Sequence, residues 1–196
     1  QPPDDATLLR SIIKYRTATQ ANAAESYDLA SATRSGGVAT YTVSNSRHLL
    51  RQGEKVTIAG SATASFDGVF HVASVPVATD PTVFTVVQAL SDESSTGGTV
   101  ASERYGRTIG GGVFYDGTLL PAAFRGNYFF TDFVEGRIMR AVMSSPTTVV
   151  SVDHFADQQG SALDLAVGPD GALYVMRHGG TIVRYGYDVP AQALVL

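Results

Sequence analysis

The sequence contains no cysteine, which excludes three classes of site at once. Disulfide frameworks, thiolate metal centres and cysteine nucleophiles all require that side chain. Lysine is nearly absent beside arginine, the formal net charge is −4, and no run of basic residues occurs, so a nucleic-acid partner is not expected. Apolar runs stay below the roughly 18–20 residues of a membrane-spanning helix, so no membrane span is expected. The polar start, Gln1–Asp5, does not resemble a signal peptide, and we expect a mature or internally cleaved terminus.

The residues that are abundant, Gly, Ser, Thr and Val, predict an all-β fold. Gly110–Tyr187 is interpreted as two runs of short apolar strands separated by Asp-Gly, Glu-Gly and Gly-Gly turns. Asp170-Gly171 is predicted to turn the chain into Leu173–Val175, and Gly179-Gly180 to turn it back through Ile182–Tyr185. Both glycine-containing pairs tolerate the positive φ of a tight hairpin.

Three segments of this stretch carry a family resemblance: GGVFYDG (111–117), FRGNYFFTDFVEGRIMRAV (124–142) and LDLAVGPDGALYVMRHGGTIVRYGY (163–187). Together they resemble the C-terminal blades of the glucose/sorbosone dehydrogenase family, whose members are secreted six-bladed β-propellers that often use pyrroloquinoline quinone (PQQ). The matching motifs belong to blade architecture, so the resemblance implies a fold more strongly than an activity. A blade takes about 40–50 residues, so this part supplies about two blades of a partial β-propeller. Two blades cannot close a ring, and they leave strand edges uncovered.

A second unit is predicted over residues 36–102, where alternating or β-branched segments are separated by turn residues. The patterns at 48–58, 66–70 and 84–86 are similar to small β-sandwich modules of phage-tail and bacterial surface proteins, which are mostly structural or adhesive. Gly/Ser-rich sequence at both ends indicates an inserted small β-sandwich. Its strands are expected at GGVATYTVS, EKVTIAG, DGVFHVASV, TVFTVVQA and GGTVAS.

The chain is therefore predicted to divide into four parts. These are an N-terminal segment packing on the propeller part (1–35), the inserted β-sandwich (36–102), the propeller-like blades (103–187) and an extended tail (188–196). Within the first part, Asp4–Tyr15 suits either a short capped helix or an edge strand. Thr17–Ser35 is small, polar and Ala-rich and is expected to be a surface connection or an irregular arm. The tail is expected to pair as an edge strand or to pack on a partner.

The family resemblance also implies where a cofactor would be held. In PQQ-binding members a pair of arginines stands just before the Asp of the penultimate blade motif, and Ser161-Ala162-Leu163-Asp164 occupies that place here. A family lysine on the strand resembling Phe130–Phe133 has no counterpart, and the nearest basic residue is Arg137. The family's catalytic His lies on an earlier blade that this chain lacks. Because a tricarboxylate quinone needs fixed cationic donors, we expect no cofactor in this chain, and PQQ with Ca²⁺ only in a complete propeller.

No catalytic or metal-binding residue is expected among the histidines. They form no His-x-His or His-x-x-x-His pair. Asp153 and His154 are neighbours, but successive side chains of a strand point to opposite faces. His71 is expected to face solvent, and all four are expected at the surface or hydrogen-bonded: His48, His71, His154 and His178.

Acidic, glycine and aromatic residues also have structural interpretations. The acidic turn residues lack the Asp-x-Asp-x-Asp run of a Ca²⁺ loop, so they are expected to form turns. Gly110-Gly111-Gly112 is not followed by the Lys-Ser/Thr of a phosphate loop and is predicted to allow a close approach of strands. The aromatics are expected mostly in the core. The acidic residues are Asp116, Asp132, Glu135 and Asp170, and the aromatics are Phe114, Tyr115, Tyr128, Phe129, Phe130 and Phe133.

The sequence therefore predicts a non-catalytic structural or binding component of an extracellular assembly. Other chains, or further polypeptide of the same protein, are expected to complete the propeller. Two alternatives stay open: a fragment of a PQQ-dependent sugar dehydrogenase whose catalytic residues lie elsewhere, and a carbohydrate-binding or adhesive module that uses the sandwich for contact. A secreted, extracellular or cell-surface location is expected, with the periplasm as the alternative.

Overall fold

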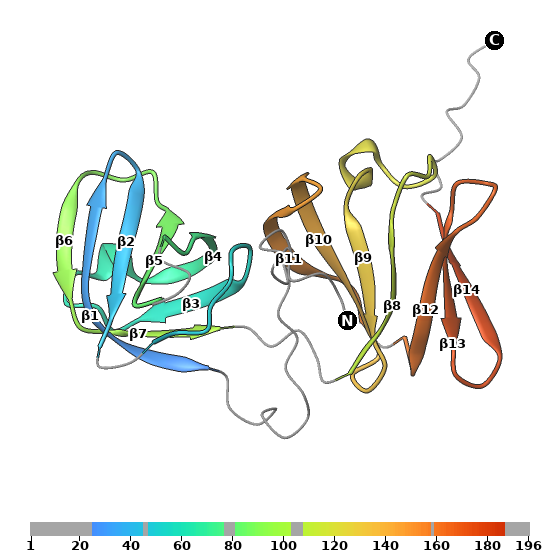
Figure 1. The fold of residues 1–196 in the computed structure, drawn as a ribbon, viewed down its shortest axis with the longest axis horizontal. Coiled ribbons are helices and arrows are strands. Elements are labelled where there is room, and N and C mark those ends of the chain that lie inside the picture. Colours follow the sequence, from blue (N-terminus) through green and yellow to red (C-terminus); the bar gives the residue numbers. More distant parts are fainter. Residues whose placement is uncertain (1–24, 45–46, 77–80, 103–107, 158, 187–196) are drawn as a thin grey trace, which may run out of the picture. The chain divides into compact units, whose positions relative to one another are not determined.

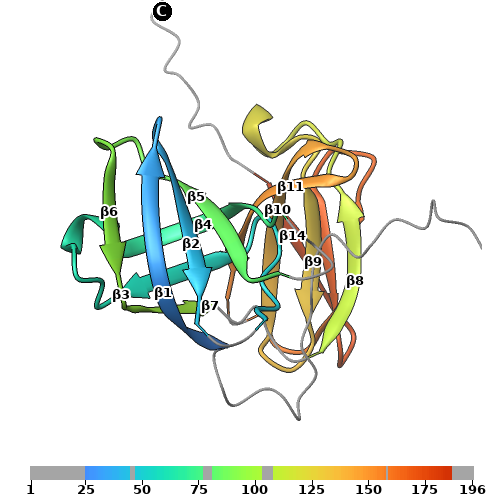
Figure 2. The ribbon, with the colours of Figure 1, turned by 60° about the vertical axis from the view of Figure 1, so that its left-hand side comes forward.

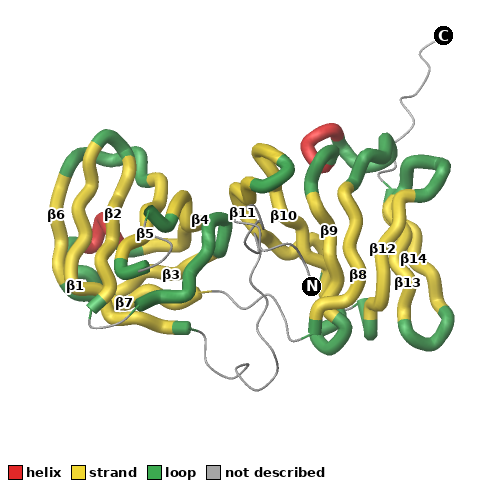
Figure 3. The backbone as a smooth tube through the Cα atoms, in the orientation of Figure 1, coloured by secondary structure: helices red, strands yellow, loops and turns green. Residues whose placement is uncertain are grey.

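The computed structural model describes residues 25–44, 47–76, 81–102, 108–157 and 159–186. Within these ranges the fold is all-β, as predicted (Figures 1 and 3). The helical elements of the described residues are two short 3-10 turns, η2 (Ala64–Phe66) and η3 (Ala122–Phe124). The predicted helix or edge strand at Asp4–Tyr15 and the tail Asp188–Leu196 lie outside the described residues.

The described residues form two compact units. The barrel unit contains those up to residue 102 together with Ala141–Asp153, and the two-sheet unit contains those of 108–140 and 154–186. Each unit is described separately below.

The barrel unit is built around a closed barrel of six antiparallel strands (Figure 2). The strand order β1-β2-β5-β4-β3-β7 returns to β1, and β6 pairs with the remaining length of β1. Each of the five predicted strand segments contains a whole observed strand at matching residues, namely β2, β3, β4, β5 and β7. The bounds are β1 (Ser26–Ser35), β2 (Val38–Val43), β3 (Lys55–Ala59), β4 (Gly68–Ser74), β5 (Val83–Val87), β6 (Glu93–Thr96) and β7 (Thr99–Ser102).

The barrel closes because β1 is long enough to pair along both of its edges. Its first residues pair with β7 (Tyr27 opposite Val100) and its later ones with β6 (Thr33 opposite Ser94), while β2 lies along the other edge. Gly97 and Gly98, at φ of 69° and 91°, bend the chain between β6 and β7. The predicted β-sandwich is therefore observed as one sheet closed on itself, not as two separate facing sheets.

Two strands of the barrel unit, β1 and β6, differ from the sequence-based expectation. β1 occupies residues expected to be an irregular arm, and β6 is the polar segment Glu-Ser-Ser-Thr. A register shift between Leu29 and Ser31 interrupts β1, so its buried residues Leu29, Ala32 and Arg34 do not keep a period of two. Strand partners on both sides therefore stabilise β1 in a conformation that its own composition does not favour.

Aromatic rings fill the barrel. Tyr41 stacks on Phe84 at 5.2 Å between ring centroids and meets Phe66 edge-on at 6.0 Å. All three side chains are fully buried. Burial raises the pKa of Tyr41 to about 12, and its hydroxyl donates to the Phe66 carbonyl at 2.8 Å. The buried polar atom is thus paired, as an apolar interior requires.

The buried side chain of Arg34 in β1 is hydrogen-bonded to the segment that connects β5 to β6 and to β6 itself. Arg34 is 3% exposed, and its guanidinium lies 4.4 Å from the Phe66 ring centroid. It donates to the Ser91 carbonyl (2.7 Å), the Gln88 side chain (2.9 Å) and the Glu93 carboxylate (3.0 Å). Because the planar guanidinium group donates to several acceptors at once, a shorter or more flexible cationic side chain would not form the same set of hydrogen bonds.

The remaining strands form a four-stranded sheet in the order β11-β10-β9-β8, of which residues 141–153 belong to the barrel unit, and a three-stranded sheet in the order β12-β13-β14 (Figure 1). The pairs β8–β9, β12–β13 and β13–β14 are antiparallel. The predicted turns are confirmed: Gly171, Gly179 and Gly180 have φ of 78°, 96° and 85°. The bounds are β8 (Ile109–Phe114), β9 (Tyr128–Asp132), β10 (Arg137–Ser145), β11 (Thr148–Ala156), β12 (Ala162–Val167), β13 (Leu173–Arg177) and β14 (Thr181–Tyr185).

The glycines of β8 let the two sheets approach closely, which confirms their predicted role. A Cβ atom added to Gly111 would lie 1.8 Å from an Asp164 carboxylate oxygen, and one added to Gly110 would lie 2.7 Å from the Leu163 carbonyl. The approach is closest where β12 faces β8 and β9. A side chain on β8 would therefore force the sheets apart at this edge.

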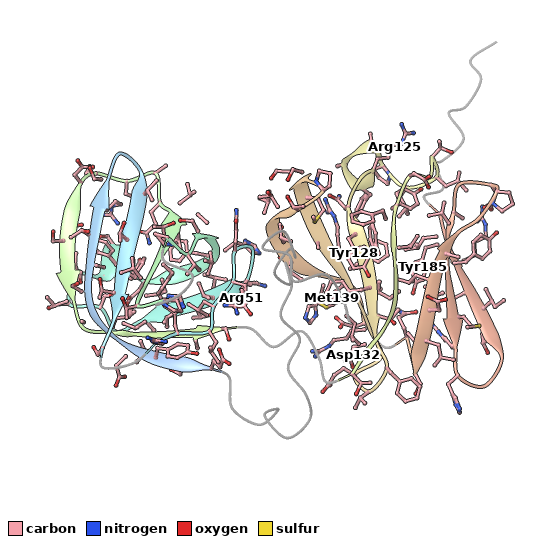
Figure 4. All side chains as sticks on the ribbon, viewed as in Figure 1. Arg51, Arg125, Tyr128, Asp132, Met139 and Tyr185 are labelled. Atoms are coloured by element: carbon pink, nitrogen blue, oxygen red, sulfur yellow. The ribbon has the colours of Figure 1, made fainter. Side chains whose placement is uncertain are left out.

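Between these sheets lies the second hydrophobic core. Phe129 and Ile138 of the first sheet pack with Leu173 and Val175 of the second. Tyr185 of β14, labelled in Figure 4, contacts Phe155 at 5.7 Å between ring centroids. The predicted core role is confirmed for Tyr115, Phe129 and Phe130, which are fully buried, whereas Phe114 is 51% exposed and packs beside Tyr128.

Candidate functional sites

The second sheet of the two-sheet unit has one buried face and one exposed face. Leu173 and Val175 point into the core, whereas Met176 and Ile182, which lie opposite each other on β13 and β14, are 46% and 66% exposed. A shallow hollow of about 220 Å³ lies on this exposed face. We call it the open face; its residues are Asp164, Leu165, Ala166, Tyr174, Met176 and Ile182.

The first sheet provides a direct comparison. Phe129 and Phe130 are successive residues of β9 and therefore point to opposite faces, yet both are fully buried. Met139 of β10, labelled in Figure 4, is also fully buried. The central strands of the first sheet are thus covered on both faces at these positions, and the open face of the second sheet is not.

A polar cluster forms the rim of the open face. Asp170 accepts hydrogen bonds from Arg184 (2.8 Å), the Tyr174 hydroxyl (3.0 Å) and the Ala172 amide (3.1 Å). The bond from Arg184 is the main cause that lowers the pKa of Asp170. Asp170 therefore serves the turn, as predicted, and it also orients Tyr174 and Arg184 beside the apolar centre.

The acidic turn at the end of β9 likewise has a structural role. Asp132, labelled in Figure 4, is fully buried and accepts hydrogen bonds from the backbone amides of Thr108 (2.6 Å) and Glu135. Among the described residues, no group of three or more His, Asp or Glu side chains is placed to hold a metal ion.

A second hollow, of about 580 Å³, lies within the barrel unit. It is mainly apolar, and Val87 and Val150 on its wall are 66% and 48% exposed. We call it the barrel hollow; its lining residues are Gln52, Phe70, His71, Ala73, Val87, Val150 and Ser151.

Three polar side chains are linked at the barrel hollow. His71 Nε2 lies 3.1 Å from Asp153 Oδ1, and the Ser151 hydroxyl donates to Asp153 Oδ2 at 2.9 Å. His71, expected to face solvent, is 33% exposed at its side chain. The sequence offers no signal for this grouping, because His71 and Asp153 are far apart in the chain.

The other histidines are dispersed. His154 lies 3.3 Å from Asp157, so it and Asp153 have different partners, as expected of neighbours on a strand. His178 is exposed and meets the Phe133 ring edge-on at 6.0 Å.

His48 contradicts the expectation of a surface or hydrogen-bonded residue. It is fully buried, and neither ring nitrogen has a partner at hydrogen-bond geometry within the described part of the chain, although the Val83 backbone lies close enough to influence its pKa. Its ring packs edge-on against Phe84 and Tyr27 at 5.6 Å and 6.3 Å. Burial lowers the pKa of His48, since an apolar environment disfavours the charged ring.

The residues at the position implied for PQQ do not fit that cofactor. Ala162 is buried, and the Ser161 carbonyl accepts a hydrogen bond from the His178 amide at 2.8 Å. The nearby cations are engaged elsewhere: Arg137 lies 3.3 Å from Asp157, and Arg177 donates to Gln159. A tricarboxylate would find no fixed pair of cationic donors among these residues.

No protein-family model matches this sequence, and no curated protein matches it. No helix among the described residues has the length and apolar character to cross a membrane.

Proposed function

We propose that this chain is a non-catalytic structural or binding component of an extracellular or cell-surface assembly, in which its two sheets are adjacent blades of a β-propeller. The convergence of the sheets along glycine-rich β8 supports this proposal. Propeller blades pack face to face around a central axis, so they come closest at their inner strands. A further blade would cover the open face.

The observation that carries the proposal is the difference between the two sheets. In the first sheet, Phe129 and Phe130 point to opposite faces of β9 and are both buried, whereas the second sheet exposes Met176 and Ile182 on one face. Burying a side chain of either type stabilises a protein by about 1.5–3 kcal/mol. The occupant we infer is another antiparallel β-sheet, because the opposite face of β12–β14 is covered by such a sheet within this unit.

Methionine oxidation tests this occupant directly. Met176 is 46% exposed and Met139 is fully buried, so the chain carries its own internal control. In the isolated recombinant chain, peroxide should oxidise Met176 quickly and Met139 slowly, because access limits the reaction. In protein isolated from its source under native conditions, Met176 should be protected at least severalfold.

Peptide mass spectrometry would measure the oxidation of Met176 and of Met139 in one sample. Equal oxidation of Met176 in the isolated chain and in the native material would contradict the proposal. Protection of Met176 together with a cross-link to a polypeptide that is not β-sheet would show that the open face binds a partner and that the blade assignment is wrong.

A further inference from the structure

We propose that the barrel hollow binds the ring of a neutral saccharide. Its volume of about 580 Å³ falls in the range of about 300–1,000 Å³ that is usual for small-molecule sites. This site is independent of the open face, because its lining residues all belong to the barrel unit and the open face belongs to the two-sheet unit.

The polar groups of the hollow suit a ligand with several hydroxyl groups. Asp153 is held by two side chains, since His71 and Ser151 bind its two carboxylate oxygens. If His71 Nε2 carries the proton that faces Asp153, Nδ1 is an acceptor, and the Ser151 oxygen keeps acceptor capacity as well. Gln52 adds an amide that both donates and accepts. Hydroxyl groups match this set because each one donates and accepts.

The apolar part of the hollow suits the C–H face of a sugar ring. Phe70, Val87 and Val150 supply an aromatic and two aliphatic surfaces, and both valines are exposed. A pyranose carries C–H groups on one face and hydroxyl groups around its rim, so it would cover the valines while its rim meets the polar groups. Sites that combine an apolar wall with a few convergent polar groups are the usual form of ligand pocket.

Two rival chemistries fit less well. The Ser151 hydroxyl donates to Asp153, and His71 is also bonded to Asp153, whereas a triad pairs the serine hydroxyl with the histidine, so acyl transfer is not supported. An anionic ligand would lie beside lining residues that are hydrogen-bonded to the Asp153 carboxylate, whose negative charge repels it.

Saturation-transfer NMR and isothermal titration with methyl glucopyranoside, methyl galactopyranoside and methyl mannopyranoside test the site. The expected result is binding of at least one of the three by the full chain. Val150→Glu should weaken that binding at least tenfold, because it places a carboxylate on the apolar wall. Asp153→Asn should also weaken it, since the amide no longer fixes His71 and Ser151 in the same way.

Val134→Glu is the matched control, because Val134 is 52% exposed and lines neither candidate site. Circular dichroism would establish that each variant is folded. Absence of binding to all three glycosides at saturating concentration would overturn the proposal, as would equal binding by the Val150→Glu and Val134→Glu variants. Oxidation of Met176 does not depend on either outcome, so this proposal and the blade assignment can fail separately.

Discussion

The two units bury their sheets in different ways. In the barrel unit the sheet closes on itself, and the buried Arg34 is hydrogen-bonded on several sides. In the two-sheet unit the second sheet presents Met176 and Ile182 to solvent. The comparison indicates that the barrel satisfies its own packing requirements, whereas the two-sheet unit has a face suited to a further protein surface. Four predictions test this difference, from the largest expected effect to the smallest.

Replacing Arg34 should produce the largest loss of stability. Arg34→Met keeps an apolar stem but leaves the buried Gln88 side chain and the carbonyl of the exposed Ser91 without their donor, and a buried unsatisfied group costs about 1–3 kcal/mol. We expect the free energy of unfolding of the barrel unit to fall by about 3 kcal/mol, measured by urea denaturation followed by circular dichroism. Arg184→Met, at an exposed ion pair, should change little, and equal effects of the two variants would contradict the comparison.

Adding one methyl group at β8 should separate the two sheets. Gly111→Ala places its Cβ atom against the Asp164 side chain and within 2.9 Å of the Asp164 Cα atom. Overpacking of this kind costs about 1–3 kcal/mol, and we expect the thermal midpoint of the two-sheet unit to fall. Gly186→Ala is the control, because its Cβ atom would lie nearest a flexible Arg184 side chain at 3.3 Å. An unchanged midpoint in Gly111→Ala would show that the close approach is not required.

His48 should make the barrel unit sensitive to acid. Burial lowers the pKa of His48 in the folded state; the Val83 backbone and the charge of Glu25 oppose this shift, and the charge of Arg51 adds to it. The unfolded chain therefore binds a proton below its normal pKa of about 6.5, while the folded barrel does not. Stability should fall as the pH drops below that value, by up to about 1.4 kcal/mol per pH unit.

Urea denaturation between about pH 5 and pH 8 would measure this slope. His48→Leu should flatten it, because the leucine does not titrate and suits an apolar site. His178→Leu, at an exposed histidine, is the control variant. If His48→Leu retains the full pH dependence, the buried ring is not its origin.

The smallest change in stability is expected at the open face. Ile182 is 66% exposed, so Ile182→Lys should alter the free energy of unfolding by no more than about 0.5 kcal/mol. It should nevertheless remove the protection of Met176 in the assembled protein, because a charge on this face opposes packing against another sheet. Val134→Lys should keep that protection, and a similar loss in both variants would locate the contact elsewhere.

The two candidate sites differ in how far they could be foreseen. The alternation of the open face was predictable, since Asp170-Gly171 and Gly179-Gly180 define a hairpin whose strands alternate. The barrel hollow was not, because His71 and Asp153 meet only through the fold, and each alone has an ordinary surface interpretation.

The sequence by itself determined the all-β class, the positions of most strands and the hairpin turns, because a turn depends on the local backbone freedom of residues such as Gly171 and Gly180. Only the tertiary structure decided that the first module closes into a barrel, that β1 is a strand, that Arg34 is fully hydrogen-bonded and that His48 is buried without a partner. These features depend on which distant strands pair with β1 and on what surrounds each side chain. Long-range pairing of this kind leaves no periodic pattern in the segments that it joins.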